Sequence, residues 1–424
     1  MTKLVINGGK TLRGIHTSPG NKNAALPMLA ASLLTDKPVH LRNLPLIEDV
    51  FTMLDIMSDT GADVRLRGRT VTVSAAGLSR TRLNRSLCSS VRSSILFAGP
   101  LAARHGSAVL FPPGGDVIGR RRLDTHFEGL SALGIVPAGR KRFTFERRRL
   151  HGADILLDEA SVTATENIIM AASIAPGTTT IYNAACEPHV QALCRMLNSM
   201  GANIGGIGTN RLKIRGVKTL KGCTCAIPPD YVDAASFLAA GALTGGAVTV
   251  KNAAWRDMEI VMRHLSKTGL KAVKKKKGLA VSSKGKLSVT DDLGSAIPKI
   301  EDGPWPSFPS DLMSAAIVLA TRAEGTVLFF EKMFESRMYF VDRLIHMGAR
   351  IVQCDPHRVI VSGPSTLRGI HMSSPDIRAG MALILAALSA EKQSVIDNVQ
   401  IIDRGYENVG AELQRLGADI SVIQ

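Results

Sequence analysis

One pattern recurs six times along this chain, and it restricts the possible folds more than any other feature of the sequence. In each copy a helical segment ends at a glycine, and a short strand-like stretch follows, as in Ser199-Met-Gly201-Ala-Asn-Ile. Successive glycines are 73, 67, 68, 79 and 69 residues apart, and they are Gly61, Gly134, Gly201, Gly269, Gly348 and Gly417. This nearly constant period predicts one supersecondary unit used six times. We expect each glycine to take the left-handed conformation that ends a helix.

A second landmark lies upstream of each glycine. It is a helix rich in Ala and Leu that is apolar on nearly every side, which predicts burial. The six predicted helices are Ala24–Leu34, Ser93–Ala103, Glu166–Ala175, Ala234–Leu243, Asp311–Ala320 and Ala379–Ser389. A strand-like stretch such as Ala247-Val-Thr-Val-Lys-Asn252 follows each of them. Each repeat therefore has the order helix, strand, amphipathic helix, glycine, strand, turn and strand, which predicts an α/β fold.

Six repeats divide most simply into two domains of three. The first Ala/Leu helix starts near residue 24, so the strand-like residues before it precede the first full repeat. The last repeat reaches the end of the chain without its closing strands, and the N-terminal strands are available to complete it. We therefore expect one domain at 21–230 and a second made of 1–20 plus 231–424. Pro228-Pro229 marks the second crossing between them.

Composition excludes several classes of function. The net charge of +16 and the pI of about 9.8 suit anionic partners. No aromatic side chains interleave with the basic clusters, so a groove for single-stranded nucleic acid is not expected. The six cysteines match no disulfide framework or zinc pattern, which predicts reduced thiols, a cytoplasmic protein and no metal site. No apolar run approaches the ~18 residues of a membrane span, and residues 1–10 contain no apolar run of signal-peptide length.

Residues 20–34 hold the first candidate for chemistry. Gly20 allows a sharp turn, and Asn21 or Asn23 is placed to cap the helix that follows. Lys22 then lies beside the exposed N–H groups of a helix start, where the helix dipole disfavours a cation. Such a lysine is well placed to bind a phosphate or carboxylate. The alternative is a solvated turn lysine with no further role.

Five motifs in order, together with the repeat, closely resemble the UDP-N-acetylglucosamine enolpyruvyl transferase (1-carboxyvinyltransferase) family. The motifs are Lys22-Asn23 in GNKNAALP, PGG at Pro113–Gly115, FPSD at Phe308–Asp311, DIR at Asp376–Arg378 and IDRGYE at Ile402–Glu407. The resemblance implies two inverse αβ barrel domains with the active site in the cleft between them. It also implies transfer of the enolpyruvyl group of phosphoenolpyruvate to the sugar 3-hydroxyl by addition and elimination. This reaction releases phosphate, requires no cofactor and is the first committed step of peptidoglycan synthesis.

The same resemblance implies roles for individual residues. Arginine keeps its charge and binds anions in a bidentate manner, which suits phosphoenolpyruvate. Asp376 is expected to orient the arginines, and the loop Phe111–Gly119 to act as a lid over the substrate. The implied phosphoenolpyruvate-binding residues are Lys22, Asn23, Arg121, Arg378 and Arg404. The implied catalytic residues are Asp116 as the acid, Asp311 as the base, Lys22 and Arg404. The implied nucleotide-sugar residues are Asn23, Arg92, Arg121, Arg122, Leu123, Asp124, Thr125, Ser161, Val162, Asp311 and Met333.

The chain departs from the usual family pattern at four positions. Asp116 stands where most members carry the cysteine that fosfomycin alkylates, so we expect an enzyme insensitive to fosfomycin. Arg122 replaces a usual proline, Glu159 a usual basic residue and Tyr231 a usual interdomain arginine. Two alternatives follow. One is a divergent paralogue that binds nucleotide-sugars or other polyanions with altered specificity or without turnover, and the other is a 5-enolpyruvylshikimate-3-phosphate synthase.

Overall fold

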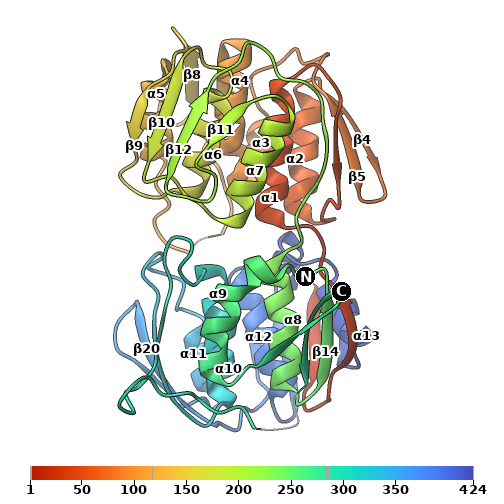
Figure 1. The fold of residues 1–424 in the computed structure, drawn as a ribbon. Helices are drawn as coiled ribbons and strands as arrows, with labels where there is room; N and C mark the ends of the chain where they lie inside the picture. Colours follow the sequence, from red (N-terminus) through yellow and green to blue (C-terminus); the bar gives the residue numbers. More distant parts are fainter. Residues whose placement is uncertain (1, 117, 283–285, 424) are drawn as a thin grey trace. The chain divides into compact units, whose positions relative to one another are not determined.

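Pairs of helices alternate with small sheets along the whole chain, as the repeat predicts (Figure 1). The computed structural model describes residues 2–116, 118–282 and 286–423. Two compact units are present. Unit 1 gathers the described residues of Met1–Pro19, Val117–Arg120 and Pro229–Gln424, and unit 2 gathers those of Gly20–Asp116 and Arg121–Pro228. These boundaries lie within two residues of the predicted crossings near residues 20 and 230.

Unit 2 contains the first three repeats. Its buried helices are α1 (Lys22–Ala31), α4 (Ala98–His105) and α6 (Val162–Ala172). Helix α1 continues as the 3-10 turn Ser32–Leu34, and the 3-10 segment Arg92–Phe97 precedes α4. Its amphipathic helices are α2 (Glu48–Asp59), α5 (Asp124–Ala132) and α7 (Pro188–Ser199), and the short α3 spans Arg85–Ser90. Alanine is abundant in the buried helices because small side chains let neighbouring helices pack closely inside one core.

Three sheets cover this helical core. The first has the order β13 (Thr224–Ala226), β3 (Val39–Arg42), β5 (Thr70–Ser74), β4 (Asp63–Arg67). The second has the order β6 (Ser107–Leu110), β8 (Phe143–Arg147), β7 (Ile135–Ala138), and the third the order β11 (Asn203–Gly205), β12 (Arg211–Arg215), β10 (Thr178–Tyr182), β9 (Asp154–Leu156). In both four-stranded sheets one edge strand runs parallel to its neighbour, and the other pairs are antiparallel.

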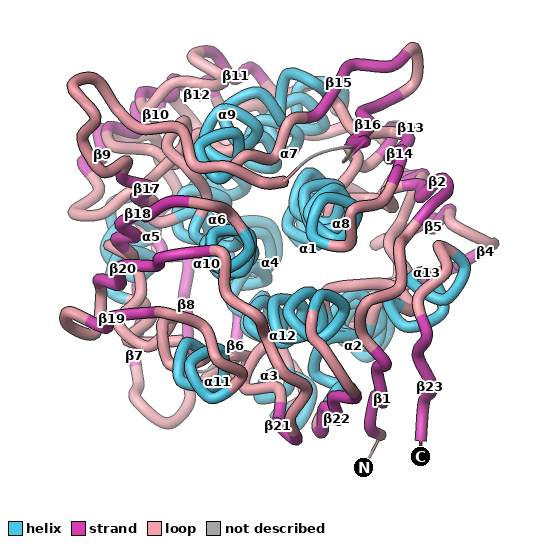
Figure 2. The backbone as a smooth tube through the Cα atoms, turned by 90° about the horizontal axis from the view of Figure 1, so that it is seen from below, coloured by secondary structure: helices cyan, strands magenta, loops and turns pink. Residues whose placement is uncertain are grey.

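Unit 1 repeats this arrangement. Helices α8 (Tyr231–Leu243), α10 (Met313–Arg322) and α12 (Ile377–Ser389) pack together in its core, and Figure 2 shows them side by side. Its amphipathic helices are α9 (Trp255–Leu265), α11 (Val341–His346) and α13 (Val409–Arg415). One sheet has the order β15 (Ala272–Lys275), β16 (Gly278–Ser282), β14 (Ala247–Lys251), β2 (Arg13–Thr17). A second sheet has the order β17 (Lys299–Glu301), β18 (Gly325–Phe330), β20 (Arg358–Gly363), β19 (Ile351–Gln353). The third sheet has the order β21 (His371–Ser373), β22 (Gln393–Asp397), β1 (Lys3–Asn7), β23 (Asp419–Ile423).

The prediction that the N-terminal strands complete the last repeat is confirmed for β1 and is wrong for β2. Strand β1 lies between β22 and β23 and is antiparallel to both, so that Leu4 is opposite Ile396 on one side and Val422 on the other. Strand β2 instead runs parallel to β14 in the sheet of the fourth repeat. The two ends of the chain therefore share one sheet.

Left-handed residues mark each repeat. The six periodic glycines all have φ between +82° and +101°, which confirms their predicted conformation. A second periodic feature, which was not predicted, is an asparagine in the same conformation at Asn43, Asn183, Asn252 and Asn398. Asparagine tolerates positive φ better than other side chains. The amide of Asn43 also donates to the carbonyl of Ile227 at 3.0 Å, which links the end of β3 to the end of β13.

The observed elements refine the predicted ones. Helix α1 starts two residues before its prediction because Asn21 caps it, and the predicted Ser93–Ala103 and Asp311–Ala320 helices both begin with a 3-10 turn. The α/β class is confirmed. The sheets are separate from one another, and no hydrogen-bonded barrel closes within the described residues. None of the helices described combines the length and hydropathy that a membrane crossing requires.

Candidate functional site

The start of α1 holds Lys22 in a buried ion pair. The Oδ1 of Asn21 accepts the N–H of Ala24 at 2.8 Å, so Asn21 is the cap and Lys22 is the first residue of the helix. Lys22 is 9% exposed, and its Nζ lies 2.6 Å from Oδ2 of Asp49 in the first turn of α2. The ammonium group thus lies in an ion pair beside a helix N-terminus, which itself favours anions. Asn23 follows on α1 and is half-buried.

A second group of cations in unit 2 surrounds Arg92, the first residue of the 3-10 segment before α4. Its Nη2 donates to the carbonyl of Arg121 at 2.6 Å. Burial and, to a smaller extent, the positive charge of Arg121 together lower the pKa of Arg92 to about 10. The like charge of Arg121 thus disfavours the charged form of Arg92, and a bound anion would offset that repulsion.

The substituted positions Arg122 and Glu159 belong to one network at the start of α5. Arg122 donates from Nε to Asp124 at 2.9 Å and lies 3.0 Å from Asp158 through Nη1. Thr125 donates to Asp158 at 2.9 Å and is 3.3 Å from Glu159. Arg122 therefore offsets the acidic charge that Glu159 adds to this region. The other predicted residues nearby are Leu123, which precedes α5, and Ser161 and Val162, which begin α6.

In unit 1, Asp311 receives two arginines. It lies in the 3-10 turn Ser310–Leu312 before α10, and its oxygens accept from Nη2 of Arg337 at 3.1 Å and from Nη2 of Arg378 at 3.0 Å. Asp376 caps α12 by accepting the N–H groups of Arg378 and Ala379, and it lies 4.0 Å from Nη1 of Arg337. These contacts place predicted residues from two different repeats in one cluster.

Arg378 carries a donor with no partner. Its Nη1 is buried and has no hydrogen-bond partner within the residues that the structure describes. A buried charged donor without a partner is unfavourable, so its position indicates an acceptor supplied by a ligand. Burial alone would lower the pKa of Arg378, but the charges of Asp311 and Asp230 outweigh burial and raise it. The guanidinium therefore remains positive.

Three buried ionisable residues of this cluster, Arg337, Glu331 and Asp302, were not predicted from the sequence. Arg337 is almost fully buried and also bonds from Nε to the hydroxyl of Ser310 at 3.3 Å. Ser310 lies 2.9 Å from each carboxyl oxygen of Glu331. Burial and a hydrogen bond with the buried Asp302 together raise the pKa of Glu331 to about 9. No local motif marks these residues, because contacts between distant segments create their environment.

The remaining predicted residues lie on loops and segment ends. Arg404 is the last residue of the 3-10 segment Val399–Arg404, and Met333 is 37% exposed. Asp116 is half-buried, and residue 117 of the predicted lid lies outside the described residues. Beyond it, the N–H of Arg120 donates to Oε2 of Glu335 at 3.0 Å. The lid function of this loop stays a prediction.

Tyr231, which stands where the family usually has an interdomain arginine, is buried at the start of α8. Its ring centroid lies 6.0 Å from that of Trp305 in the same unit. The aromatic side chain therefore packs into unit 1 and supplies none of the charge that an arginine would carry at this position.

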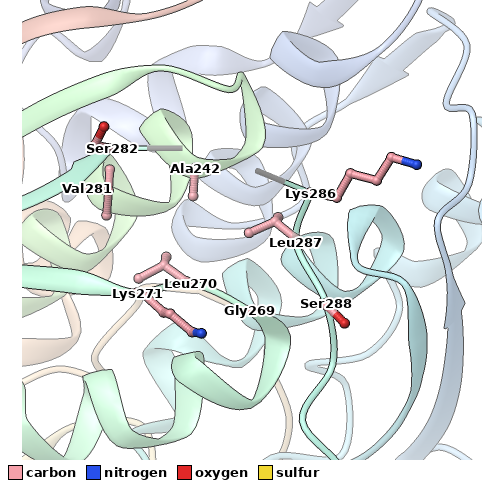
Figure 3. A pocket seen from close by; sticks show the side chains of 9 residues that line it. All are labelled: Ala242, Gly269, Leu270, Lys271, Val281, Ser282, Lys286, Leu287 and Ser288. Atoms are coloured by element: carbon pink, nitrogen blue, oxygen red, sulfur yellow. The ribbon is translucent and has the colours of Figure 1, made fainter. Parts of the chain in front are cut away.

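Two hollows in the structure contain none of the predicted site residues. One, of about 260 Å³, lies beside Leu270, Leu287 and Lys286 in unit 1 (Figure 3). The other, of about 730 Å³, lies in unit 2 where the buried helices end, and Arg104 and Arg147 line it. Arg104 donates there to the carbonyl of Leu33 and Arg147 to the carbonyl of Ala103, so both arginines have a structural role at these helix ends. Within the described part of the chain, no three potential ligand side chains gather as a metal ion would require.

Comparison with known proteins gives consistent matches over the whole chain. The family model for EPSP synthase (3-phosphoshikimate 1-carboxyvinyltransferase) matches residues 6–420. UDP-N-acetylglucosamine 1-carboxyvinyltransferase of Borreliella burgdorferi is 51% identical over 425 residues, covering 100% of both chains. The proteins of the same name are 50% identical in Treponema denticola, over 100% of this chain and 99% of the relative, and 48% identical in Bradyrhizobium diazoefficiens, over 99% and 97%.

Solved structures share the fold at lower identity. The enolpyruvyl transferase NikO from Streptomyces tendae has a TM-score of 0.88 at 21% identity, with 99% of this chain and 98% of that chain covered. EPSP synthase from Acinetobacter baumannii has a TM-score of 0.78 at 20% identity, with both chains covered completely. At such identities the likeness concerns the fold alone.

Proposed function

Because this chain belongs to the UDP-N-acetylglucosamine 1-carboxyvinyltransferase family, we propose that it transfers the enolpyruvyl group of phosphoenolpyruvate to the 3-hydroxyl of UDP-N-acetylglucosamine. The reaction releases phosphate and begins peptidoglycan synthesis in the cytoplasm. The buried Nη1 of Arg378, which has no partner among the described residues, is the observation that carries the proposal. An anionic acceptor suits this charged donor, and the phosphate or carboxylate of phosphoenolpyruvate is such an acceptor.

Four cations hold phosphoenolpyruvate in this proposal. Arg378 and Arg404 come from unit 1, and Lys22 and Arg121 come from unit 2, with Asn23 beside Lys22. We propose that the two units act as domains on one pair of substrates. Neutralising the phosphate also favours its departure in the elimination step, because charge develops on the leaving group.

Asp311 accepts the proton of the sugar hydroxyl. Its two oxygens are fixed by Arg337 and Arg378, so the carboxylate is oriented before substrate arrives. Each carboxylate oxygen has a second lone pair, so the sugar hydroxyl can donate to Asp311 while both arginines stay bound. Asp376 acts indirectly, because it caps α12 and so fixes the backbone of Arg378.

Asp116 supplies the proton that the methylene carbon of phosphoenolpyruvate gains. A carboxylic acid donates a proton only while it is protonated, which requires removal from water or a nearby negative charge. The bound phosphate provides that charge when the substrate is in place. Asn23, Arg92, Arg121 to Thr125, Ser161, Val162, Asp311 and Met333 bind the nucleotide-sugar in this proposal.

Phosphate release measured with both substrates tests the function. The protein should release phosphate with phosphoenolpyruvate and UDP-N-acetylglucosamine together, and not with either alone. Arg378→Lys keeps the charge but loses the second donor, so we expect the KM for phosphoenolpyruvate to rise about tenfold or more. The matched control is Arg343→Lys on the exposed face of α11.

The same assay separates the two alternatives. Phosphate release with shikimate 3-phosphate in place of the nucleotide-sugar would identify an EPSP synthase. Binding of UDP-N-acetylglucosamine without phosphate release would identify a paralogue that does not turn over. Either result would overturn the proposal.

A further inference from the structure

Tyr406 lies in the IDRGYE motif and is 3% exposed, yet the proposed reaction assigns it no role. It follows the 3-10 segment that ends at Arg404. The guanidinium carbon of Arg378 lies 5.3 Å from the centroid of its ring. This distance is within the range of a cation–π contact, and such contacts strengthen when water is excluded.

The hydroxyl of Tyr406 is anchored to α8. Its oxygen lies 3.0 Å from Oγ of Ser236, and Ser236 already donates its only hydroxyl proton to the carbonyl of Val232 at 2.8 Å. Ser236 must therefore accept, and Tyr406 must donate. Every residue of α8 is buried, so this hydrogen bond ties the ring to a rigid part of the core.

The guanidinium of Arg378 is consequently held on two sides. One edge binds Asp311 through Nη2 at 3.0 Å, and one face lies against Tyr406. The Nη1 atom remains without a partner among the residues described. An arginine that is already restrained loses less side-chain entropy when its ligand binds, so the ligand binds more tightly.

We propose that Tyr406, anchored by Ser236, is a positioning residue that orients Arg378 so that its Nη1 points to the anionic substrate. The inference rests on the proposed function, because it assigns the anion at that atom to phosphoenolpyruvate. Tyr406 itself needs no contact with substrate. Its contribution is to the affinity for the anion, and it should leave nucleotide-sugar affinity unchanged.

Two substitutions separate the ring from the hydroxyl. Tyr406→Leu removes the aromatic face, and we expect the KM for phosphoenolpyruvate to rise about three- to tenfold at saturating nucleotide-sugar. Tyr406→Phe retains the face but loses the anchor, so its KM for phosphoenolpyruvate should lie between those of the wild type and Tyr406→Leu. The KM for UDP-N-acetylglucosamine should stay within about twofold of the wild type in both variants. Equal changes in both KM values, or none, would overturn the inference.

The chain offers a matched control in unit 2. Arg211 lies 5.0 Å from the ring centroid of Tyr182 and donates to its hydroxyl at 3.4 Å, and neither residue is assigned to the site. Tyr182→Leu removes the same type of contact on the surface and should leave both KM values unchanged. A rise in the phosphoenolpyruvate KM of this control equal to that of Tyr406→Leu would also refute the inference.

A double substitution tests the anchor even if the leucine variant fails to fold. Ser236→Ala and Tyr406→Phe each break the same hydrogen bond, so their combined effect on phosphoenolpyruvate affinity should not exceed the larger single effect. Additive effects would contradict the anchor. Titration calorimetry with phosphoenolpyruvate measures affinity without turnover. A wild type that binds phosphoenolpyruvate but releases no phosphate would refute the proposed function while leaving this inference open to the same comparison.

Discussion

Replacing His16 by glutamine should destabilise unit 1 and change how its stability depends on pH. His16 is 3% exposed and lies on β2. Its Nε2 is 2.8 Å from Asp233 of α8, its Nδ1 is 2.9 Å from Glu412 of α13, and its ring stacks on Phe237 with centroids 3.6 Å apart. Both ring nitrogens face carboxylates, so the imidazole binds both best when it is doubly protonated and positive.

The expected magnitude follows from what remains after substitution. Removing one partner of a buried ion pair costs about 3–5 kcal/mol, because the other charge stays buried. Asp233 keeps the hydroxyl of Ser18 at 2.9 Å, and Glu412 keeps Arg415 at 2.6 Å, so the lower end of that range applies. Since about 1 kcal/mol shifts the Tm of a unit of this size by roughly 2–4 °C, a loss of about 6–12 °C is expected.

The pH dependence has a definite sign. Burial lowers the pKa of His16, but the hydrogen bonds and charges of Asp233 and Glu412 outweigh it and raise the pKa above 6.5. The stabilisation is therefore fully present below pH 6.5 and is lost as the pH rises through the folded-state value. Where the folded protein binds one proton more than the unfolded chain, the free energy of unfolding falls by about 1.4 kcal/mol per pH unit. Glutamine does not titrate, so its variant should lack this component.

Differential scanning calorimetry of the full chain between pH 6 and pH 9 measures both effects. His371 provides the control, because its Nε2 also lies 2.7 Å from a carboxylate, that of Asp397, but its side chain is 61% exposed. An exposed pair contributes little, so His371→Gln should leave the transition nearly unchanged. An unaltered pH slope in His16→Gln would refute the argument that His16 is charged in the folded state.

Three further outcomes are expected. Asp116→Cys should be inactivated by fosfomycin over time, unlike the unmodified protein, because a thiolate is a stronger nucleophile than a carboxylate; intact mass would reveal the covalent adduct. Asp116→Asn should lose most phosphate release, and an active Asp116→Asn variant would show that another group donates the proton. Because burial and Asp302 raise the pKa of Glu331 to about 9, stability should fall as pH rises from 4.5 toward 9, and Glu331→Gln should flatten that decline in calorimetry. Gly201→Ala should cost about 1–2 kcal/mol in chemical unfolding from backbone strain alone, since no atom lies within 4 Å of the added carbon; an unchanged midpoint would contradict this.

The sequence predicted the fold well where a local rule repeats. Each periodic glycine has positive φ, because only glycine adopts that conformation without strain after a helix. The strand at Lys3–Asn7 was correctly expected to complete the last repeat, because the repeat count left one strand missing. The predicted starts of helices were less accurate. The cap at Asn21 begins α1 at Lys22, whereas apolar content alone predicts Ala24.

Site residues were predictable only through motifs. Lys22, Asp311 and Arg378 belong to the motifs, and the structure places each beside an opposite charge. Arg337 and Asp49 complete those ion pairs, but nothing in their local sequence distinguishes them from surface charges. Asp49 in particular has the pattern of an ordinary first-turn acid on an amphipathic helix. Asp49 is 27 residues from Lys22 and Arg337 is 26 residues from Asp311, so these ion pairs could not be read from local spacing.

The pairing of β1 has a consequence for how the chain is made. Leu4 pairs with Ile396 of β22 and Val422 of β23, so β1 is synthesised long before either of its partners. Unit 2 is encoded between them and has its own core, so it is able to fold while unit 1 is still incomplete. Until β22 and β23 have been made, both edges of Lys3–Asn7 lack their native partners, and such strands tend to associate with other chains. During translation β1 therefore needs protection from such association.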